Sequence, residues 1–539
     1  MLVIAPLLAP GYLLLRDAVS TPRSYLSDAA LGLTEAAPRA LPQDFAIAVA
    51  SHVVDGGVVV KALLIAGLWL AGWGAARLTA VVLPEAGVPG QFVAVTLAVW
   101  NPYVAERLLQ GHWSLLVGYG CLPWVAATIL RLRDSSGSWS PLIFWMALAG
   151  LTPTGLMLAA AVALTCTLAP GTGRPRWACA AVSLVTATLA ALPWLVASAV
   201  AGSLSSSQAD GVPAFAARAE PGLGTLLSLA GLGGIWNGQA VPTSRTTLFA
   251  VVATVVLLAV VAVGLPTALR RPAAVPLMVL AAVAVVVPAL MATGPGLALV
   301  ESTVRMLPGV GVIRDAQKWV ALAMPGYAVA AAAAVVTLRA RLPAAATAAA
   351  CCVALLAVLP DLAWGVGGKV VAVRYPPGWA ATAALINADP RPVAVLPADS
   401  MRDFAWAGTA PVLDPLPRWV SADVLATGDL VISGRTVPGE GERAREVQRL
   451  LASGAGADAV ARTGVGWVVV ESAGAAPQAL PVAYRDDDLT LYWVGGDHPA
   501  AAHRGVLIGA HLVWAAMLAV GAVGSLPAVR RIRRIRAGR

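Results

Sequence analysis

Long apolar runs alternate with short polar loops along most of the chain. A helix needs about 20 apolar residues to cross the hydrocarbon core of a bilayer. Runs that approach this length lie at 2–15, 58–76, 90–104, 113–130, 177–200, 246–267, 274–293, 319–337, 343–360 and 505–526. The run 141–168 is too long for one helix, and Leu-Thr-Pro-Thr-Gly at 151–155 interrupts it, because proline disrupts a helix interior and glycine favours a turn. We therefore expect two short helices there and about twelve membrane segments altogether.

Arginines between these runs give the segments a direction. If 141–168 forms a hairpin, the loop and tail arginines all fall on one side: Arg77, Arg131, Arg133, Arg174, Arg176, Arg270, Arg271, Arg339, Arg341, Arg530, Arg531, Arg533, Arg534 and Arg536. The positive-inside rule makes that side cytoplasmic. Both termini are then inside the cell, and the loops 16–57, 201–245, 294–318 and 361–503 lie outside an inner membrane.

Composition supports a polytopic α-helical membrane protein. Of the 539 residues, 58% are hydrophobic and 12% are charged, whereas an average soluble domain carries roughly 25% charged residues. The net charge of +9 does not indicate nucleic acid as a partner, because the arginines follow the loop pattern expected beside a lipid bilayer. All five cysteines lie in apolar runs, so neither a disulfide framework nor a Cys/His metal site is expected.

The segment 369–503 differs from the rest, and it divides the chain into a multi-span domain (1–368), this outer domain, and a last helix with a basic tail (504–539). Helical patterns at 377–387 and 440–451 alternate with strand-like runs at 392–397, 467–471 and 489–493, which is typical of a small α/β domain. The segment has no Gly-rich phosphate loop and no nucleophile elbow. We expect no cofactor, although Asp486-Asp487-Asp488 fits either a divalent-cation site or, more commonly, a solvated turn.

Charged residues near the outer ends of spans are candidates for chemistry, because charge at membrane depth is costly. Asp17 lies where the first run should leave the bilayer, and a carboxylate there can act as a general base on an acceptor hydroxyl. The alternative is an interfacial ion pair of Asp17 with Arg16 or Arg23. Asp44 is the second catalytic candidate, and it can instead cap a helix over 45–51.

Two further clusters lie on the same side. Between the third and fourth runs, Arg107 and His112 are candidates to bind a phosphate, and their neighbours Asn101, Tyr103, Glu106 and Trp113 are candidates for an acceptor pocket. An aromatic-belt turn explains the same residues. Before the tenth run, Arg314 and Lys318 are four apart, so on one helix they share a face that can bind a lipid-linked phosphate. Snorkelling to ordinary headgroups is the alternative.

These clusters, in this order, resemble the C-type superfamily of integral-membrane glycosyltransferases that use polyprenyl-phosphate sugars. Asp17 matches the position of that superfamily's general base. The stretches Asn101-Pro102-Tyr103, Glu106-Arg107 and Gly111-His112-Trp113 look like the third-to-fourth helix region of its bacterial members, which include YfhO-like proteins and actinobacterial arabinosyl- and mannosyltransferases. Arg314-Asp315-Ala316-Gln317-Lys318 looks like their late-loop basic motif, and Tyr375-Pro376-Pro377-Gly378-Trp379 is similar to the YfhO-like outer domain. The chain departs from the best-defined members because its first loop lacks an adjacent acidic pair.

The resemblance implies an inverting transfer at the outer face. Asp17 would deprotonate a hydroxyl of a cell-envelope glycan or glycolipid acceptor, and Arg107, Arg314 and Lys318 would stabilise the departing lipid phosphate. The donor would be a polyprenyl-phosphate sugar, and arabinofuranose or mannose is favoured by the Ala/Val/Gly/Arg-rich composition. Two other classes stay open: a transporter or flippase of lipid-linked intermediates, and a non-catalytic envelope scaffold. The sequence shows no convincing internal repeat of the kind common in transporters.

Overall fold

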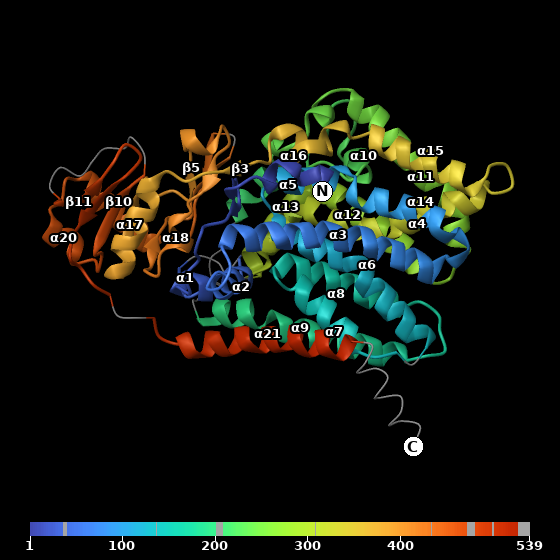
Figure 1. Ribbon diagram of the computed structural model, residues 1–539, viewed down its shortest axis with the longest axis horizontal. Helices are drawn as coiled ribbons and strands as arrows, with labels where there is room; N and C mark the ends of the chain where they lie inside the picture. Colours follow the sequence, from blue (N-terminus) through green and yellow to red (C-terminus); the bar gives the residue numbers. More distant parts are fainter. Residues whose placement is uncertain are drawn as a thin grey trace, which may run out of the picture.

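The computed structural model describes residues 1–35, 40–135, 137–200, 209–307, 309–432, 434–471, 480–498 and 501–526, and it is mostly helical (Figure 1). Six helices in this part of the chain are long and apolar enough to cross a membrane: α3 (Gly56–Val82), α6 (Trp113–Asp134), α9 (Arg176–Val200), α11 (Phe249–Leu269), Ala316–Leu338 (η8 with α14) and α21 (Arg504–Ser525). Two bent pairs raise the number to eight if each is one span: α12 (Val275–Met291) with α13 (Gly294–Met306), bent by 91°, and α15 (Ala344–Ala357) with Pro360–Gly368, bent by 74°.

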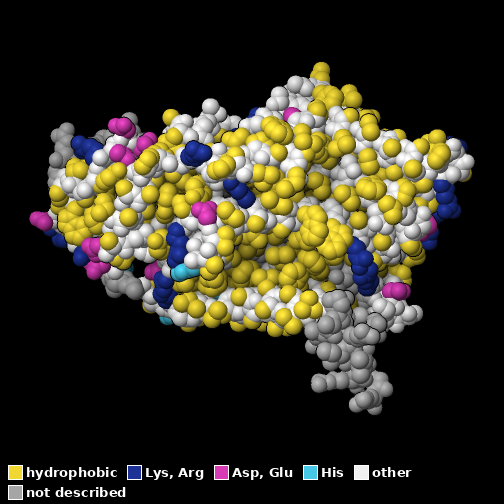
Figure 2. All heavy atoms as spheres, in the orientation of Figure 1, with side chains coloured by type: hydrophobic (Ala, Val, Ile, Leu, Met, Phe, Trp, Pro, Cys, Tyr) yellow, Lys and Arg dark blue, Asp and Glu magenta, His cyan; other side chains and the backbone are white. Residues whose placement is uncertain are grey.

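The surface of the helical body is that of a membrane-embedded protein. The helices α3 and α21 run along the long axis of the molecule, and the α/β domain lies beyond one end of them (Figure 1). Figure 2 shows a broad apolar expanse over these helices, whereas basic and acidic side chains gather over the α/β domain and near the opposite end. Exposed apolar side chains need no water on such a surface, because lipid replaces it.

The expected break in 141–168 is confirmed. Helix α7 (Ser140–Ala149) ends before α8 (Pro153–Thr167), and the Thr152 side chain caps α8 by accepting a bond of 3.0 Å from the amide of Gly155. The loops on either side of this hairpin meet: the amides of Gly173 and Arg174 donate to the carbonyls of Arg133 and Leu132, at 2.8 and 2.7 Å. Two of the basic loops therefore share one end of the molecule, as the arginine pattern requires.

The prediction of a first span over 2–15 is wrong. Leu2–Leu8 forms a short 3-10 helix (η1), and Tyr12–Leu15 then forms the strand β1. Pro6 lies inside η1 and Pro10 follows it, and proline prevents a continuous helix through this stretch. The cytoplasmic placement of the N-terminus depended on this span and loses its basis.

The third expected run is also shorter than a span. Helix α4 (Gly87–Val99) has 13 residues, which gives about 20 Å of length against a core of about 30 Å. It ends at Trp100, and Asn101 then caps a separate short helix, α5 (Pro102–Leu109). The twelve segments expected from the sequence are not shown.

The expected α/β domain is present after residue 369. Its sheet has the order β11-β12-β10-β4-β7, and β4 (Val393–Leu396) is parallel to both of its neighbours, β10 (Trp467–Val470) and β7 (Val424–Leu425). The strand β12 (Thr490–Trp493) pairs antiparallel with β10 and with β11 (Val482–Arg485). The expected helices are α17 (Pro377–Ala388) and α19 (Glu442–Ala452). Short β-branched runs made the strands β4 and β10 predictable.

A small sheet joins the two parts of the molecule. The strand β1 pairs with β2 (Ala18–Val19) and with β3 (Ala372–Val373), which leads into the α/β domain. Leu14 and Val19 belong to the apolar core that contains Trp379 and Val393 of that domain. The N-terminal residues therefore connect the α/β domain to the membrane helices.

Smaller elements complete the fold: α1 (Asp28–Leu31), α2 (Gln43–Ala50), α10 (Thr225–Ala230), α16 (Ala363–Gly368), β5 (Met401–Arg402), β6 (Val412–Leu413), α18 (Leu416–Trp419), β8 (Leu430–Ile432), β9 (Arg435–Val437) and α20 (Ala457–Ala461).

Candidate functional site

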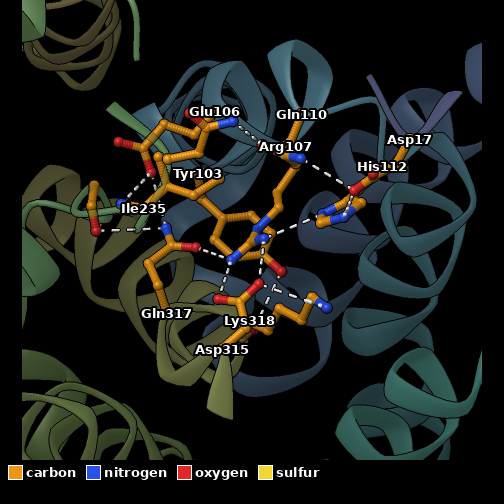
Figure 3. A network of polar contacts seen from close by, with 12 residues as sticks. Asp17, Tyr103, Glu106, Arg107, Gln110, His112, Ile235, Asp315, Gln317 and Lys318 are labelled. Carbon is orange, nitrogen blue, oxygen red and sulfur yellow. Dashed lines mark hydrogen bonds and ion pairs between the residues drawn. The ribbon is translucent and has the colours of Figure 1, made fainter. Parts of the chain in front are cut away.

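The short helix α5 carries the centre of a buried polar network, shown in Figure 3. Asn101 begins this helix: its side chain accepts from the amide of Val104 at 3.1 Å and donates to the Tyr119 hydroxyl at 3.0 Å. Every residue of α5 is buried. A buried helix that carries Glu106 and Arg107 requires polar partners from other elements, because unpaired charge in a low-dielectric interior is costly.

Arg107 finds these partners in the segment just before α14. Its two terminal nitrogens donate to both oxygens of Asp315 at 3.0 and 3.2 Å, and one of them also donates to the side-chain oxygen of Gln317. The Arg107 side chain has no exposed surface. Burial alone would raise the pKa of Asp315, but Arg107 and Lys318 beside it hold that pKa well below its usual range. The pair Arg107–Asp315 is therefore ionised and enclosed.

Glu106 extends the network in the other direction. Its carboxylate accepts from the amides of Gly234 and Ile235 at 3.1 and 3.2 Å, and from the Gln317 amide at 3.0 Å. Gln317 therefore lies between Arg107 and Glu106, accepting from the first and donating to the second. Three donors satisfy the buried carboxylate, so Glu106 fixes α5 against the loop that contains residues 234 and 235.

His112 links Arg107 to Asp17. Arg107 bonds to His112 Nδ1 at 3.1 Å, and His112 Nε2 bonds to Asp17 Oδ2 at 2.9 Å. Because a guanidinium can only donate, His112 Nδ1 is the acceptor. The hydrogen of the imidazole is therefore on Nε2, which donates a hydrogen bond to Asp17. Gln110 donates to the same Asp17 oxygen at 3.1 Å. Within the described part of the chain no hydrogen bond reaches the other oxygen, Oδ1, which is left for a further donor.

The network opens to the surface at Asp17, His112 and Lys318. Their side chains are 40%, 16% and 24% exposed, respectively. Lys318 lies 3.5 Å from Asp315, and its backbone carbonyl accepts from the Tyr103 hydroxyl at 3.1 Å. A carboxylate, an imidazole and an ammonium therefore share one accessible edge, behind which Arg107 and Asp315 are buried.

Electrostatics set the protonation states of Asp17 and His112 at neutral pH. Partial burial works to raise the pKa of Asp17, but the hydrogen bonds from His112 and Gln110 and the nearby charge of Lys318 lower that pKa below its usual value. Burial also lowers the pKa of His112. At neutral pH Asp17 is consequently an ionised acceptor, and His112 is a neutral donor that orients it.

Several residues expected in the site lie outside this network. Arg314 ends a separate 3-10 helix (Val310–Arg314) and lies over the Phe215 ring, 5.0 Å from its centroid. The predicted shared helix face with Lys318 is wrong, because Asp315 separates this 3-10 helix from the next one. Arg314 therefore does not join Lys318 in the network of Figure 3.

Asp44 pairs with Arg418 of the α/β domain, at 3.2 Å. It lies in the first turn of α2, whose N-cap is Pro42, so the expected cap at Asp44 is also wrong. Asp44, Arg418 and Trp113 line a small, partly open cavity between the segment 19–47 and the α/β domain. Trp113 therefore faces this cavity, whereas Asn101 and Tyr103 are buried beneath the network.

Sequence reasoning gave no role to three participants of the network: Gln110, Asp315 and Gln317. A signal existed for Asp315, since a carboxylate between two cations near a span end is a natural partner for a buried arginine. No local pattern connects Gln317 with Glu106, because 211 positions separate them along the chain.

The acidic run 486–488 behaves as a turn. Asp486 Oδ1 accepts from the amides of Asp488 and Leu489 at 3.0 and 2.9 Å, just before β12 begins. Among the residues that the structure describes, no group of three or more His, Cys, Asp or Glu side chains is arranged to hold a metal ion.

Comparison with protein-family models, curated proteins and solved structures finds no match.

Proposed function

We propose that the chain is a membrane glycosyltransferase that moves a sugar from a polyprenyl-phosphate donor to a cell-envelope glycan or glycolipid on the outer face of the inner membrane. The observation that carries the proposal is the state of Asp17. One of its oxygens is fixed by His112 and Gln110, its other oxygen accepts no hydrogen bond from the described residues, and the accessible ammonium of Lys318 belongs to the same network. A base and a cation that share one accessible edge are what phosphate displacement by a hydroxyl requires.

The reaction needs one proton transfer and one displacement. Asp17 Oδ1 takes the proton of the acceptor hydroxyl while the acceptor oxygen bonds to the anomeric carbon. The bond from that carbon to the phosphate oxygen breaks on the opposite face, so the configuration inverts. The lipid phosphate leaves with the bonding electron pair, and Lys318 stabilises its charge.

The roles first assigned to the cations change in this proposal. Arg107 has no exposed surface and is held by Asp315, Gln317 and His112, so it acts on Asp17 through His112 instead of binding phosphate. Lys318 is the accessible cation of the network and takes the phosphate. Arg314 has no part in the displacement.

The test uses the protein reconstituted in liposomes with a radiolabelled donor and an envelope glycan fraction as acceptor. The first donors are polyprenyl-phosphate arabinofuranose and polyprenyl-phosphate mannose. The proposal predicts label in the glycan with an inverted anomeric configuration. Retained configuration, or no transfer from either donor in the presence of the glycan fraction, contradicts it.

One observation favours a second candidate, a flippase for lipid-linked intermediates. The bent pairs α12–α13 and α15 with Pro360–Gly368 resemble the discontinuous helices of transporters. The same liposomes distinguish the two functions. Movement of labelled lipid between leaflets without transfer to the glycan supports the flippase, and transfer without net movement supports the enzyme.

A further inference from the structure

The turn that carries Asp17 is a tight two-residue hairpin loop. Leu15 of β1 faces Ala18 of β2, so Arg16 and Asp17 alone connect the strands. Arg16 has a φ of +49°, a conformation that glycine adopts freely and that costs other residues about 1 kcal/mol. A large side chain at such a position indicates that its contacts offset the strain.

The Arg16 guanidinium reaches the membrane part on both sides of the site. One terminal nitrogen donates to the carbonyl of Leu109, at the end of α5, at 2.5 Å, and the other donates to the carbonyl of Gln239 at 2.9 Å. The side chain is buried. These two carbonyls flank Gln110, which bonds to Asp17 and whose side-chain oxygen accepts from Asn237 at 2.8 Å.

The Arg16 backbone is bound to the α/β domain. Its amide donates to the carbonyl of Pro411 at 3.1 Å, and its carbonyl accepts from the amide of Leu413 at 2.8 Å. The next amide, that of Asp17, donates to the carbonyl of Gln110 at 3.2 Å. One residue therefore joins the α/β domain, α5 and the 237–239 loop, immediately beside the carboxylate.

We propose that Arg16 is a positioning residue that fixes Asp17 against Gln110 and His112, and that the α/β domain is a working part of the site through its backbone bonds to Arg16. The role of Asp17 as a base rests on the proposed function, whereas the positioning does not. The α/β domain then contributes to turnover directly.

The size of the effect follows from what positioning contributes. A displacement of about 1 Å at a reacting group can reduce the rate about 100-fold without weakening substrate binding. Loss of the Arg16 side chain frees the hairpin from the carbonyls of Leu109 and Gln239, while Lys318, the cation for the donor, keeps its contacts. We therefore expect a lower kcat with little change in KM for the donor.

The variant of choice is Arg16→Gly, because glycine relieves the strained turn and removes only the guanidinium contacts. We expect kcat to fall about 50- to 100-fold, donor KM to stay within about twofold, and millimolar guanidinium to restore part of kcat. Arg16→Lys, which keeps a cation without the fork of donors, is expected to lie between wild type and Arg16→Gly. Tyr375→Phe is the matched control, because it removes a bond of 2.9 Å from the α/β domain to the carbonyl of Ser20 in the same hairpin without touching Asp17.

A second measurement does not need transferase activity. A carbodiimide modifies protonated carboxyl groups, so the pH dependence of Asp17 labelling, followed by mass spectrometry, reports its titration. The groups that bear on Asp17 are His112, Gln110, Lys318 and the Arg16 cation. Loss of the Arg16 charge by itself also raises this midpoint, so the decisive variant is Arg16→Lys, which keeps the charge. With positioning, the labelling midpoint of Arg16→Lys still moves up from that of wild type, because the bonds from His112 and Gln110 weaken.

The outcomes separate the two proposals. If the wild-type protein transfers no sugar but the labelling midpoint is shifted in Arg16→Lys, the positioning by Arg16 is supported and the proposed function is contradicted. An unchanged midpoint in Arg16→Lys overturns the positioning proposal, whatever the activity. A fall in kcat that Tyr375→Phe reproduces also overturns it, since any loosening of the hairpin would then have the same effect.

Discussion

Replacing Arg107 with methionine should destabilise the fold more than any exposed substitution. The methionine keeps most of the apolar stem but removes the donors to Asp315, Gln317 and His112. It leaves the Asp315 carboxylate, itself buried, without its bidentate partner.

The magnitude follows from the burial of both partners. Removing one member of a buried ion pair costs about 3–5 kcal/mol, because the other charge stays desolvated. Lys318 still lies 3.5 Å from Asp315 and compensates part of this cost. We therefore expect the free energy of unfolding to fall by about 3 kcal/mol, at the lower end of that range.

The assay is unfolding in mixed micelles titrated with SDS, followed with a thiol-reactive fluorophore. Cys121, Cys166 and Cys179 are buried in helices and become reactive only when these open. The control is Arg271→Met, which removes a largely exposed partner of Glu85 and should cost no more than about 1 kcal/mol.

The double variant Arg107→Met with Asp315→Leu tests the reason for the loss. With the carboxylate gone as well, the two effects should fall short of additivity by about 1–3 kcal/mol. A loss below about 1 kcal/mol for Arg107→Met, or full additivity in the double variant, would refute a buried ionised pair.

Three further predictions concern other parts of the molecule. Lys318→Met should raise the donor KM at least tenfold in the transfer assay, because it removes the accessible cation of the network, and an unchanged KM would exclude Lys318 from phosphate binding. Burial lowers the pKa of His112 in the folded state, so the unfolded chain binds more protons below about pH 6.5, and stability should fall as the pH drops through that value. His112→Gln should flatten this dependence between pH 5 and 7 in the SDS assay, and an equal slope in both proteins would contradict it. Gly264→Leu should destabilise the packing of α11 on α14, since a Cβ at residue 264 would lie 1.9 Å from the carbonyl oxygen of Ala330; unchanged thermal unfolding would show that the helices can separate without cost.

Periodicity and turn chemistry predicted much of the fold. The break at 151–155 and the elements of the α/β domain follow from local patterns that the structure confirms, because Thr152, Pro153 and short β-branched runs act on their neighbours in sequence. The same reasoning gave a wrong prediction for residues 2–15. Their hydrophobicity suits a span, but it is used by β1 to pack Leu14 against the α/β domain, a partner more than 350 positions away in sequence.

The candidate site was predictable only in part. Asp17, Arg107, His112 and Lys318 stood out because charge near span ends is costly, and the structure brings them together. Which of the two cations is accessible to a ligand was not predictable, because this depends on burial. Arg107 and Lys318 have the same charge, but only Lys318 reaches the surface. The links through Gln317 and Arg16 depend on tertiary contacts that a single sequence does not record.

The most direct measurement is the transfer rate of Asp17→Asn in proteoliposomes with a labelled polyprenyl-phosphate sugar. Asparagine keeps the shape of the side chain but cannot take the proton of the acceptor, so kcat should fall about 100- to 10,000-fold with donor KM nearly unchanged. Asp55→Asn is the matched control, because Asp55 caps α3 outside the network and asparagine caps equally well. Transfer undiminished in Asp17→Asn, or lost in Asp44→Asn instead, would contradict Asp17 as the base.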